Sequence, residues 1–129
     1  MSEHSLRVGL VGANAEGSWA KLAHVPALDM LSGFTLTAVA TRRMASAEAA
    51  AHAFGAMEAY DDFRRLVRSN NVDIVTVCVR VPAHLDVVMA ALEAGKHVMC
   101  EWPLGRDLEE AEKMAEAART FGVRTCIGL

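Results

Sequence analysis

Apolar residues along the chain alternate between short continuous runs and stretches in which they recur every three or four positions. Short runs rich in β-branched residues are typical of buried strands, and the wider spacing is typical of helices that bury one face. The runs predict strands at residues 6–11, 35–40, 57–60, 73–81, 97–100 and 124–127. The spaced stretches predict helices at residues 18–31, 45–54, 61–69, 83–94 and 107–121.

Residues that begin or end helices lie where this pattern changes. Pro26 interrupts the first predicted helix, because its ring removes a donor and clashes one turn back. The second helix is predicted to be capped by Ser46 or a neighbour and to end at Gly55. Asp107 and Glu110 have capping-box spacing, so the last helix is predicted to begin there.

Alternation of strand and helix along the whole chain predicts right-handed crossovers and a parallel sheet. The predicted fold class is therefore α/β, a Rossmann-type doubly wound parallel sheet of about six strands with helices on both faces. In such a sheet the ligand binds at the carboxyl ends of the strands, where the strand order reverses. The loops at that edge are residues 12–17, 41–43, 79–84 and 101–103.

Composition narrows the class of protein. The 129 residues suit one domain with its own core, and 53% hydrophobic residues with 22% charged residues are typical of a globular protein. A net charge of −3, without a basic block, argues against a nucleic-acid partner. No apolar run approaches the roughly 20 residues that span a membrane. Residues 1–5 are polar and lack a signal-peptide core, so we expect a cytoplasmic protein without membrane contact.

The cysteines are odd in number and far apart. Cys78, Cys100 and Cys126 each fall within an apolar, strand-like run, which predicts buried thiols in a reducing compartment rather than a disulfide framework. The histidines show no metal-ligand spacing, so no metal site is expected.

The first predicted strand runs into a glycine turn, as it does in nucleotide-binding α/β domains. Gly12 allows a tight turn, and Gly17 is predicted to let the next helix pack closely. Backbone N–H groups at the helix start would then bind a pyrophosphate. Asn14 replaces the second glycine of the usual G-x-G-x-x-G pattern, so a domain that has lost cofactor binding remains an alternative.

Two arginines follow the second predicted strand, where a dinucleotide fold meets the adenosine ribose. An acidic residue that would select NAD is missing there, and Thr41 is followed by Arg42 and Arg43. Because guanidinium groups match a 2′-phosphate through forked, charge-assisted hydrogen bonds, NADP is favoured over NAD. The alternative is that both arginines are simply solvated.

Two further loops carry residues of interest. His84 either lines the cofactor cleft or simply caps the helix that follows. Glu101 ends a predicted strand and could accept from a ribose hydroxyl, and the indole of Trp102 could cover a nicotinamide face. Trp102 packed on the domain surface is the alternative.

Together these stretches resemble the N-terminal domain of the Gfo/Idh/MocA family of sugar and inositol dehydrogenases. The matching pieces are RVGLVGANAEG, HVPAL, LTAVATR, AYDDFRRLV, VDIVTVCVRVPAH and ALEAGKHVMCEWPLG, with the final helix and strand. The resemblance implies a single NAD(P)-binding domain over residues 1–129, whose substrate-binding partner domain is absent from this chain. By resemblance, the cofactor-binding positions are Gly12, Asn14, Ala15, Gly17, Thr41, Arg42, Val79, Arg80, Val81, His84 and Glu101.

One departure bears on catalysis. Trp102 occupies the position of the lysine in the family's usual Glu-Lys-Pro, so no catalytic residue is assignable. The Glu-Trp-Pro signature resembles a branch that includes the fungal galactose-regulon repressor. The resemblance thus implies hydride transfer to or from a sugar- or polyol-like substrate in a full-length parent, which could form a homo-oligomer through the missing domain. A non-catalytic dinucleotide-sensing regulatory module is the alternative.

Overall fold

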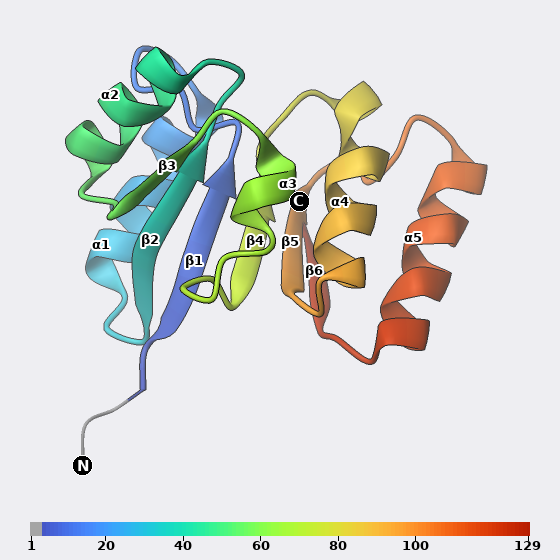
Figure 1. Ribbon diagram of the computed structural model, residues 1–129. Helices are drawn as coiled ribbons and strands as arrows, with labels where there is room; N and C mark the ends of the chain where they lie inside the picture. Colours follow the sequence, from blue (N-terminus) through green and yellow to red (C-terminus); the bar gives the residue numbers. More distant parts are fainter. Residues whose placement is uncertain (1–3) are drawn as a thin grey trace.

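The computed structural model describes residues 4–129 and contains one six-stranded parallel sheet (Figure 1). The strand order is β3-β2-β1-β4-β5-β6, so the order reverses between β1 and β4. The predicted Rossmann-type α/β fold is confirmed. The strands are β1 (Leu6–Val11), β2 (Phe34–Ala40), β3 (Glu58–Tyr60), β4 (Ile74–Val77), β5 (His97–Glu101) and β6 (Thr125–Gly128).

Helices connect successive strands and lie on both faces of the sheet. In Figure 1, α1 and α2 lie beside the β1–β3 half, and α4 and α5 lie together beside the β4–β6 half. The helical elements are η1 (Ala20–His24), α1 (Val25–Met30), α2 (Met44–Phe54), α3 (Phe63–Leu66), η2 (Val81–Ala83), α4 (His84–Glu93) and α5 (Leu108–Phe121).

Two apolar clusters form the core, one on each face. One cluster joins α4 and α5 to the sheet through Leu92 and Met114 packed with Val77 and Val98. The other joins η1 and α2 to β1 and β2, and it includes the fully buried Leu10. Alternation of side chains along each strand explains this division, because neighbours in sequence point to opposite faces.

The helix ends follow the expected chemistry with one correction. α2 ends at Gly55 as predicted, and the Asp107 carboxylate caps α5 by accepting from the Glu110 N–H at 2.9 Å. Ser46 does not cap α2, because it already lies within the first turn and its hydroxyl donates to the Arg43 carbonyl at 2.9 Å. The helix begins after Arg43 without a side-chain cap.

Pro26 changes the geometry of the first helical segment. The turn before it is a π-helix, in which the Val25 N–H donates to the Ala20 carbonyl five residues back. Pro26 then lies in the first turn of α1, where its missing N–H costs least. The predicted interruption at this proline is therefore confirmed as a change of helix type.

Two predicted elements are shorter than expected. The strand predicted at residues 73–81 ends at Val77, because the chain leaves the sheet after the Cys78 N–H bonds to the Val11 carbonyl. Its continuing apolar residues form a loop rather than a strand. The helix predicted at residues 61–69 is a regular α-helix only at Phe63–Leu66, after a side-chain cap from Asp62.

The cysteine prediction is correct in part. All three thiols are free, but only Cys100 is buried; Cys78 is half-buried and Cys126 is exposed. Cys126 is exposed because its face of β6 carries no helix within residues 4–129. Of the polar segment at residues 1–5, the first three residues lie outside the described part. Among the described residues, no helix combines the length and apolar character that crossing a bilayer requires.

Candidate functional site

The four predicted loops gather at the carboxyl edge of the sheet, where β1 and β4 lie side by side. The Gly12 N–H donates to the Ala40 carbonyl at 2.9 Å, which joins the β1 loop to the end of β2. The Cys78 N–H donates to the Val11 carbonyl at 2.9 Å, which joins the β4 loop to the end of β1. Backbone hydrogen bonds thus form a shared floor at the point where strand order reverses, the usual place for a ligand in this architecture.

Gly12 forms the tight turn, and no other residue type fits. Its φ is +90°, which disfavours every L side chain. A Cβ at this position would also lie 2.9 Å from both the carbonyl carbon and the oxygen of Cys78. The turn therefore stays free of side chains, and the β1 and β4 loops pack backbone against backbone.

Asn14 preserves this turn although it replaces a glycine. None of the described non-glycine residues has a positive φ. Asn14 therefore has a backbone conformation that does not require glycine. The Asn14 side-chain oxygen accepts from the Glu16 N–H at 2.8 Å. The Asn14 backbone carbonyl oxygen accepts from the Ser18 hydroxyl at 2.7 Å. Within residues 4–129, the N–H groups of Asn14 and Ala15 donate to no protein acceptor. They are available to an anionic ligand.

The predicted role of Gly17 in close helix packing is wrong. A Cβ on Gly17 would meet no atom within 4 Å. The helical segment begins only after a further turn, with the Ser18 hydroxyl accepting from the Lys21 N–H at 3.1 Å. The extra residues between the glycine turn and the helix move Gly17 away from the strand.

The loop after β2 presents cationic groups on an ordered backbone. The Thr41 N–H donates to the Tyr60 carbonyl at 3.1 Å, and its hydroxyl donates to the Arg43 carbonyl at 2.8 Å. Arg42 and Arg43 are exposed, and among the described residues neither forms an ion pair. Two guanidinium groups that have no ion-pair partner within residues 4–129 suit an anionic group of a ligand.

The loop after β4 rests on His84. The His84 side chain is buried, with Nε2 2.9 Å from the Val79 carbonyl oxygen and Nδ1 3.1 Å from the Leu104 carbonyl oxygen. Val79 and Val81 are half-buried, and Arg80 is exposed at the loop surface. The imidazole lies beneath this loop and both its nitrogens have partners, so its influence on a ligand runs through the loop backbone.

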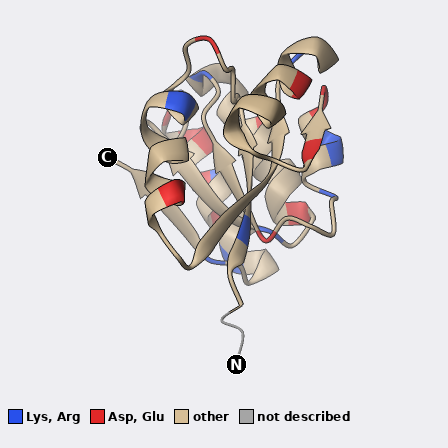
Figure 2. Cartoon of the chain, turned by 90° about the vertical axis from the view of Figure 1, so that its left-hand side faces the viewer, with Lys and Arg blue, Asp and Glu red and all other residues tan. Residues whose placement is uncertain are grey.

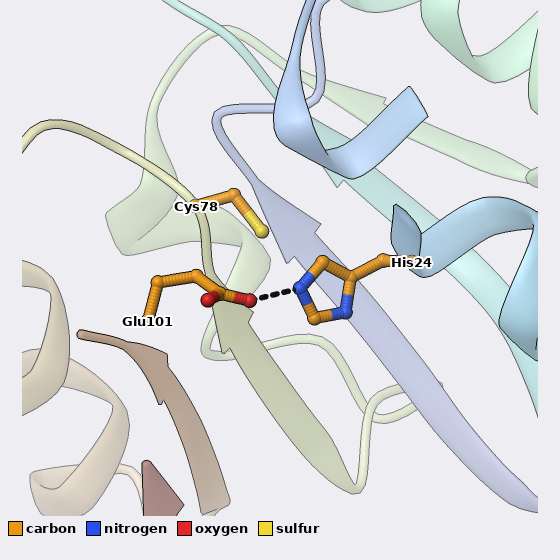
Figure 3. Close-up of side chains that lie close together, drawn as sticks. All are labelled: His24, Cys78 and Glu101. Atoms are coloured by element: carbon orange, nitrogen blue, oxygen red, sulfur yellow. Dashed lines mark hydrogen bonds and ion pairs between the residues drawn. The ribbon is translucent and has the colours of Figure 1, made fainter. Parts of the chain in front are cut away.

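Glu101 at the end of β5 has a partner that the sequence patterns did not suggest. The His24 Nε2 atom, from the last residue of η1, forms a hydrogen bond with Glu101 Oε1 (Figure 3). In Figure 3 the imidazole and carboxylate point toward each other, and the Cys78 thiol lies beside them. His24 was part of a matching sequence piece, but it lies 77 residues from Glu101 and no local spacing links them.

His24, Cys78 and Glu101 together form a mixed donor set. One ligand atom from each lies within 4.8 Å of the others, although the sequence predicted no metal site. Burial, with the nearby negative charge of Glu101, raises the pKa of the Cys78 thiol to about 12. The thiol is therefore protonated at neutral pH and acts here as a small, weakly polar neighbour of the His24–Glu101 pair.

An apolar trough of about 840 Å³ lies beside this pair, between one face of β4, β5 and β6 and the η1–α1 segment. Ile74, Thr76 and Met99 line it from the sheet, and η1 and α1 line its opposite side. His24 and Glu101 line the end nearest the candidate site. The carboxylate therefore lies at one end of this apolar surface, beside His24.

Charge elsewhere is dispersed. Figure 2 shows acidic and basic positions scattered over helices and loops in that view, rather than gathered into one patch. Trp102, which follows Glu101, is 64% exposed, so its indole is placed on the surface next to the site.

These features fit a dinucleotide. The side-chain-free turn at Gly12 and the N–H groups of Asn14 and Ala15 suit a pyrophosphate. The arginines after β2 suit the adenosine end, and Glu101 after β5 suits a ribose hydroxyl. A parallel sheet with this arrangement at its reversal point defines a dinucleotide-binding Rossmann-type domain.

Comparison with known proteins assigns the domain more closely. Residues 6–129 match the Gfo/Idh/MocA family, described as the oxidoreductase family with an NAD-binding Rossmann fold. The chain belongs to this family, as its sequence pieces predicted.

Three relatives illustrate the range of the family. The chain is 34% identical to D-glucoside 3-dehydrogenase of Escherichia coli, covering 95% of this chain and 34% of that protein. It is 32% identical to the galactose/lactose metabolism regulatory protein GAL80 of Saccharomyces cerevisiae, covering 96% of this chain and 31% of that protein. The crystal structure of KijD10, a 3-ketoreductase from Actinomadura kijaniata in complex with NADP, superposes with a TM-score of 0.88 at 31% identity, covering 96% and 38%. The chain thus spans about a third of the length of these relatives.

Proposed function

We propose that this chain is the cofactor-binding domain of an NADP-preferring oxidoreductase. The observation that carries the proposal is the turn at Gly12, where a Cβ would meet the Cys78 carbonyl group at 2.9 Å. This close approach holds the β1 and β4 loops together at the reversal point of the sheet, where folds of this class bind a pyrophosphate. The N–H groups of Asn14 and Ala15, with no acceptor among the described residues, would hold its oxygens.

The preference for NADP rests on the loop after β2. Arg42 and Arg43 are exposed, and they would bind a 2′-phosphate, while Thr41 orders their backbone. An acidic residue that would accept from both ribose hydroxyls is missing from this loop. The NADP bound to the 3-ketoreductase relative supports the same assignment.

The remaining predicted contacts belong to the nicotinamide half. The loop at residues 79–81 would lie along the cofactor, and Glu101 would accept from the nicotinamide ribose. A bound nicotinamide supplies the hydride carrier, and the protein supplies orientation and exclusion of water. The substrate would be sugar- or polyol-like, as the name of the E. coli relative suggests. It would be bound by a further domain of a longer protein, through which that protein could also form a homo-oligomer.

A second candidate function is a non-catalytic dinucleotide sensor. Trp102 is the observation that favours it, because an exposed indole cannot replace the charged proton donor of the family's usual lysine. The similarity to a yeast regulatory protein points the same way. For either function we propose a cytoplasmic location, which the three free cysteines support.

Calorimetric titration with NADPH and NADH tests the proposal directly. We expect NADPH to bind at micromolar concentration and about tenfold more tightly than NADH, a difference of about 1.4 kcal/mol. Absence of binding by either nucleotide at millimolar concentration would contradict both candidate functions. Hydride transfer from a panel of glucosides and polyols to NADP, measured on the longer protein, separates enzyme from sensor.

A further inference from the structure

The strongest unassigned feature is the pairing of His24 with Glu101 at the end of β5. We propose that His24 is a positioning residue, which orients the Glu101 carboxylate toward a hydroxyl of the nicotinamide ribose and so couples the η1 turn to one half of the cofactor. This inference rests on the proposed function, since it concerns the same cleft. It adds a residue to which neither the sequence patterns nor the family resemblance gave a role.

The carboxylate is confined from two sides. Its Oε1 atom is bonded to His24 Nε2, and the side chains are 14% and 23% exposed for His24 and Glu101 respectively. On the other side, a Cβ built on Gly128 would lie 2.8 Å from Glu101 Oε2, so β6 approaches the carboxylate closely. A glutamate restrained in this way has lost most of its rotamer freedom before a ligand arrives.

Restraint still leaves room for a ligand. An ionised carboxylate offers about four acceptor positions, and His24 uses one of them. Glu101 lines the end of the apolar trough, and 23% of its side chain is exposed. A ribose hydroxyl that donates to this carboxylate therefore meets an acceptor already held in place, with a donor behind it.

The local sequence explains why His24 reaches this position. Ala20 is fully buried against the sheet, and His24 follows four residues later on the same side of the segment. The π-helical turn widens the backbone there, and Pro26 begins the α-helix that follows. Single π turns inside helices often occur at functional sites.

The test compares a whole cofactor with one half of it. NADPH and adenosine 2′,5′-bisphosphate, which lacks the nicotinamide mononucleotide half, are titrated calorimetrically into wild type, His24→Leu and His24→Gln. We expect His24→Leu to weaken NADPH about tenfold, the loss of one hydrogen bond to a charged group, and to leave the bisphosphate within about twofold. His24→Gln keeps an N–H donor at similar reach and should restore NADPH affinity to within about threefold.

A mutant cycle shows whether His24 acts through Glu101. In a Glu101→Ala background, the further change His24→Leu should alter NADPH affinity by less than about twofold, because the group it positions is gone. The matched control is His52→Leu on the exposed face of α2, which should change neither affinity. Circular dichroism and thermal melting of each variant report whether it is folded.

Each result decides the matter. Equal weakening of NADPH and the bisphosphate by His24→Leu, or no rescue by His24→Gln, would mean that His24 only supports the fold, and would overturn the inference. Normal NADPH affinity in folded His24→Leu would overturn it as well, with the proposed function intact. Failure of the wild type to bind NADPH or NADH would overturn the proposed function and this inference together.

Discussion

The two ends of the candidate cleft are built in opposite ways. After β2, Arg42 and Arg43 stand exposed on a loop whose order comes from the backbone and from Thr41. After β5, Glu101 is mostly buried and already bonded to His24, next to an apolar trough. One end offers exposed positive charge to a ligand, and the other offers a single carboxylate held in place.

This difference separates how each end contributes to binding. Exposed cations attract an anion over several ångströms but lose side-chain freedom on contact and are screened by salt. A restrained acceptor attracts a ligand only at short range, but it loses little conformational entropy when the ligand binds. We therefore expect the β2 end to determine which dinucleotide binds, and the β5 end to determine how its reactive half is oriented.

The largest effect is expected for a substitution in the floor of the cleft, which should weaken binding at both ends. Gly12→Ala places a Cβ against the Cys78 carbonyl group at a φ of +90°, so the β1 and β4 loops must move apart. Strain of this kind costs about 1–3 kcal/mol. Thermal melting should fall by several degrees, and NADPH and the bisphosphate should both bind at least about tenfold more weakly.

Gly33→Ala is the matched control for that change. A Cβ there meets no atom within 4 Å, and the position has no left-handed φ. Its melting temperature and NADPH affinity should equal those of the wild type. Unchanged affinity in Gly12→Ala would show that the cleft floor does not need the side-chain-free turn.

The next effect concerns only the β2 end. Arg42→Ala should weaken NADPH about tenfold and NADH less than about twofold, because only NADPH carries the 2′-phosphate. Calorimetric titration at low and at high salt should show a shallower salt dependence for NADPH in the variant. The control is Arg68→Ala, an exposed arginine that follows α3. Equal loss for both nucleotides would remove the distinction between the two ends.

The smallest effect on NADPH binding is expected for a substitution at the amino ends of the strands, opposite the candidate site. Asp73 accepts three hydrogen bonds from Arg7, which hold its pKa at about 2. Because the folded pKa lies below the usual value, the stabilisation is present above about pH 4 and is lost as the pH falls toward 2. Asp73→Asn should cost about 1–2 kcal/mol at pH 7 after allowance for partial exposure, and should leave NADPH affinity within about twofold.

Urea unfolding at several pH values measures this stabilisation. The wild type should lose stability between pH 4 and pH 2 more steeply than Asp73→Asn, and the two should converge at the acid end. Parallel curves would mean that the Arg7–Asp73 pair contributes nothing to folding. A large loss of NADPH affinity would mean that fold stability and cleft geometry are not separable.

The sequence predicted the sheet well because periodicity and strand length are local properties. The strand predicted at residues 73–81 was too long because the prediction used this local pattern alone. Val79 and Val81 are apolar, but they lie in a loop at the reversal point. Local pattern cannot report where a strand leaves its neighbours. Cys126 was predicted to be buried from its apolar run, yet burial depends on what covers that face of β6.

Residues of the candidate site were predictable from the sequence where their position at the end of a strand indicates their role. Gly12 and the arginines after β2 are identified by their place at strand ends, which alternation alone predicts. The pairing of His24 with Glu101 was not, because it joins an interrupted helix to a strand 77 residues later. The exclusion of side chains by the Cys78 carbonyl likewise depends on two loops that meet only in the folded chain.

The exposed position of β6 at the end of the sheet has a practical consequence for the isolated domain. Within residues 4–129, β6 pairs with β5 alone, and Cys126 and Ile127 are both exposed on it. An edge strand with open backbone groups and apolar side chains is a template for strand addition by another chain, and its accessible thiol can crosslink such pairs. Aggregation during expression and storage should therefore begin at this edge, and a reducing agent with a charged substitution at Ile127 would limit it.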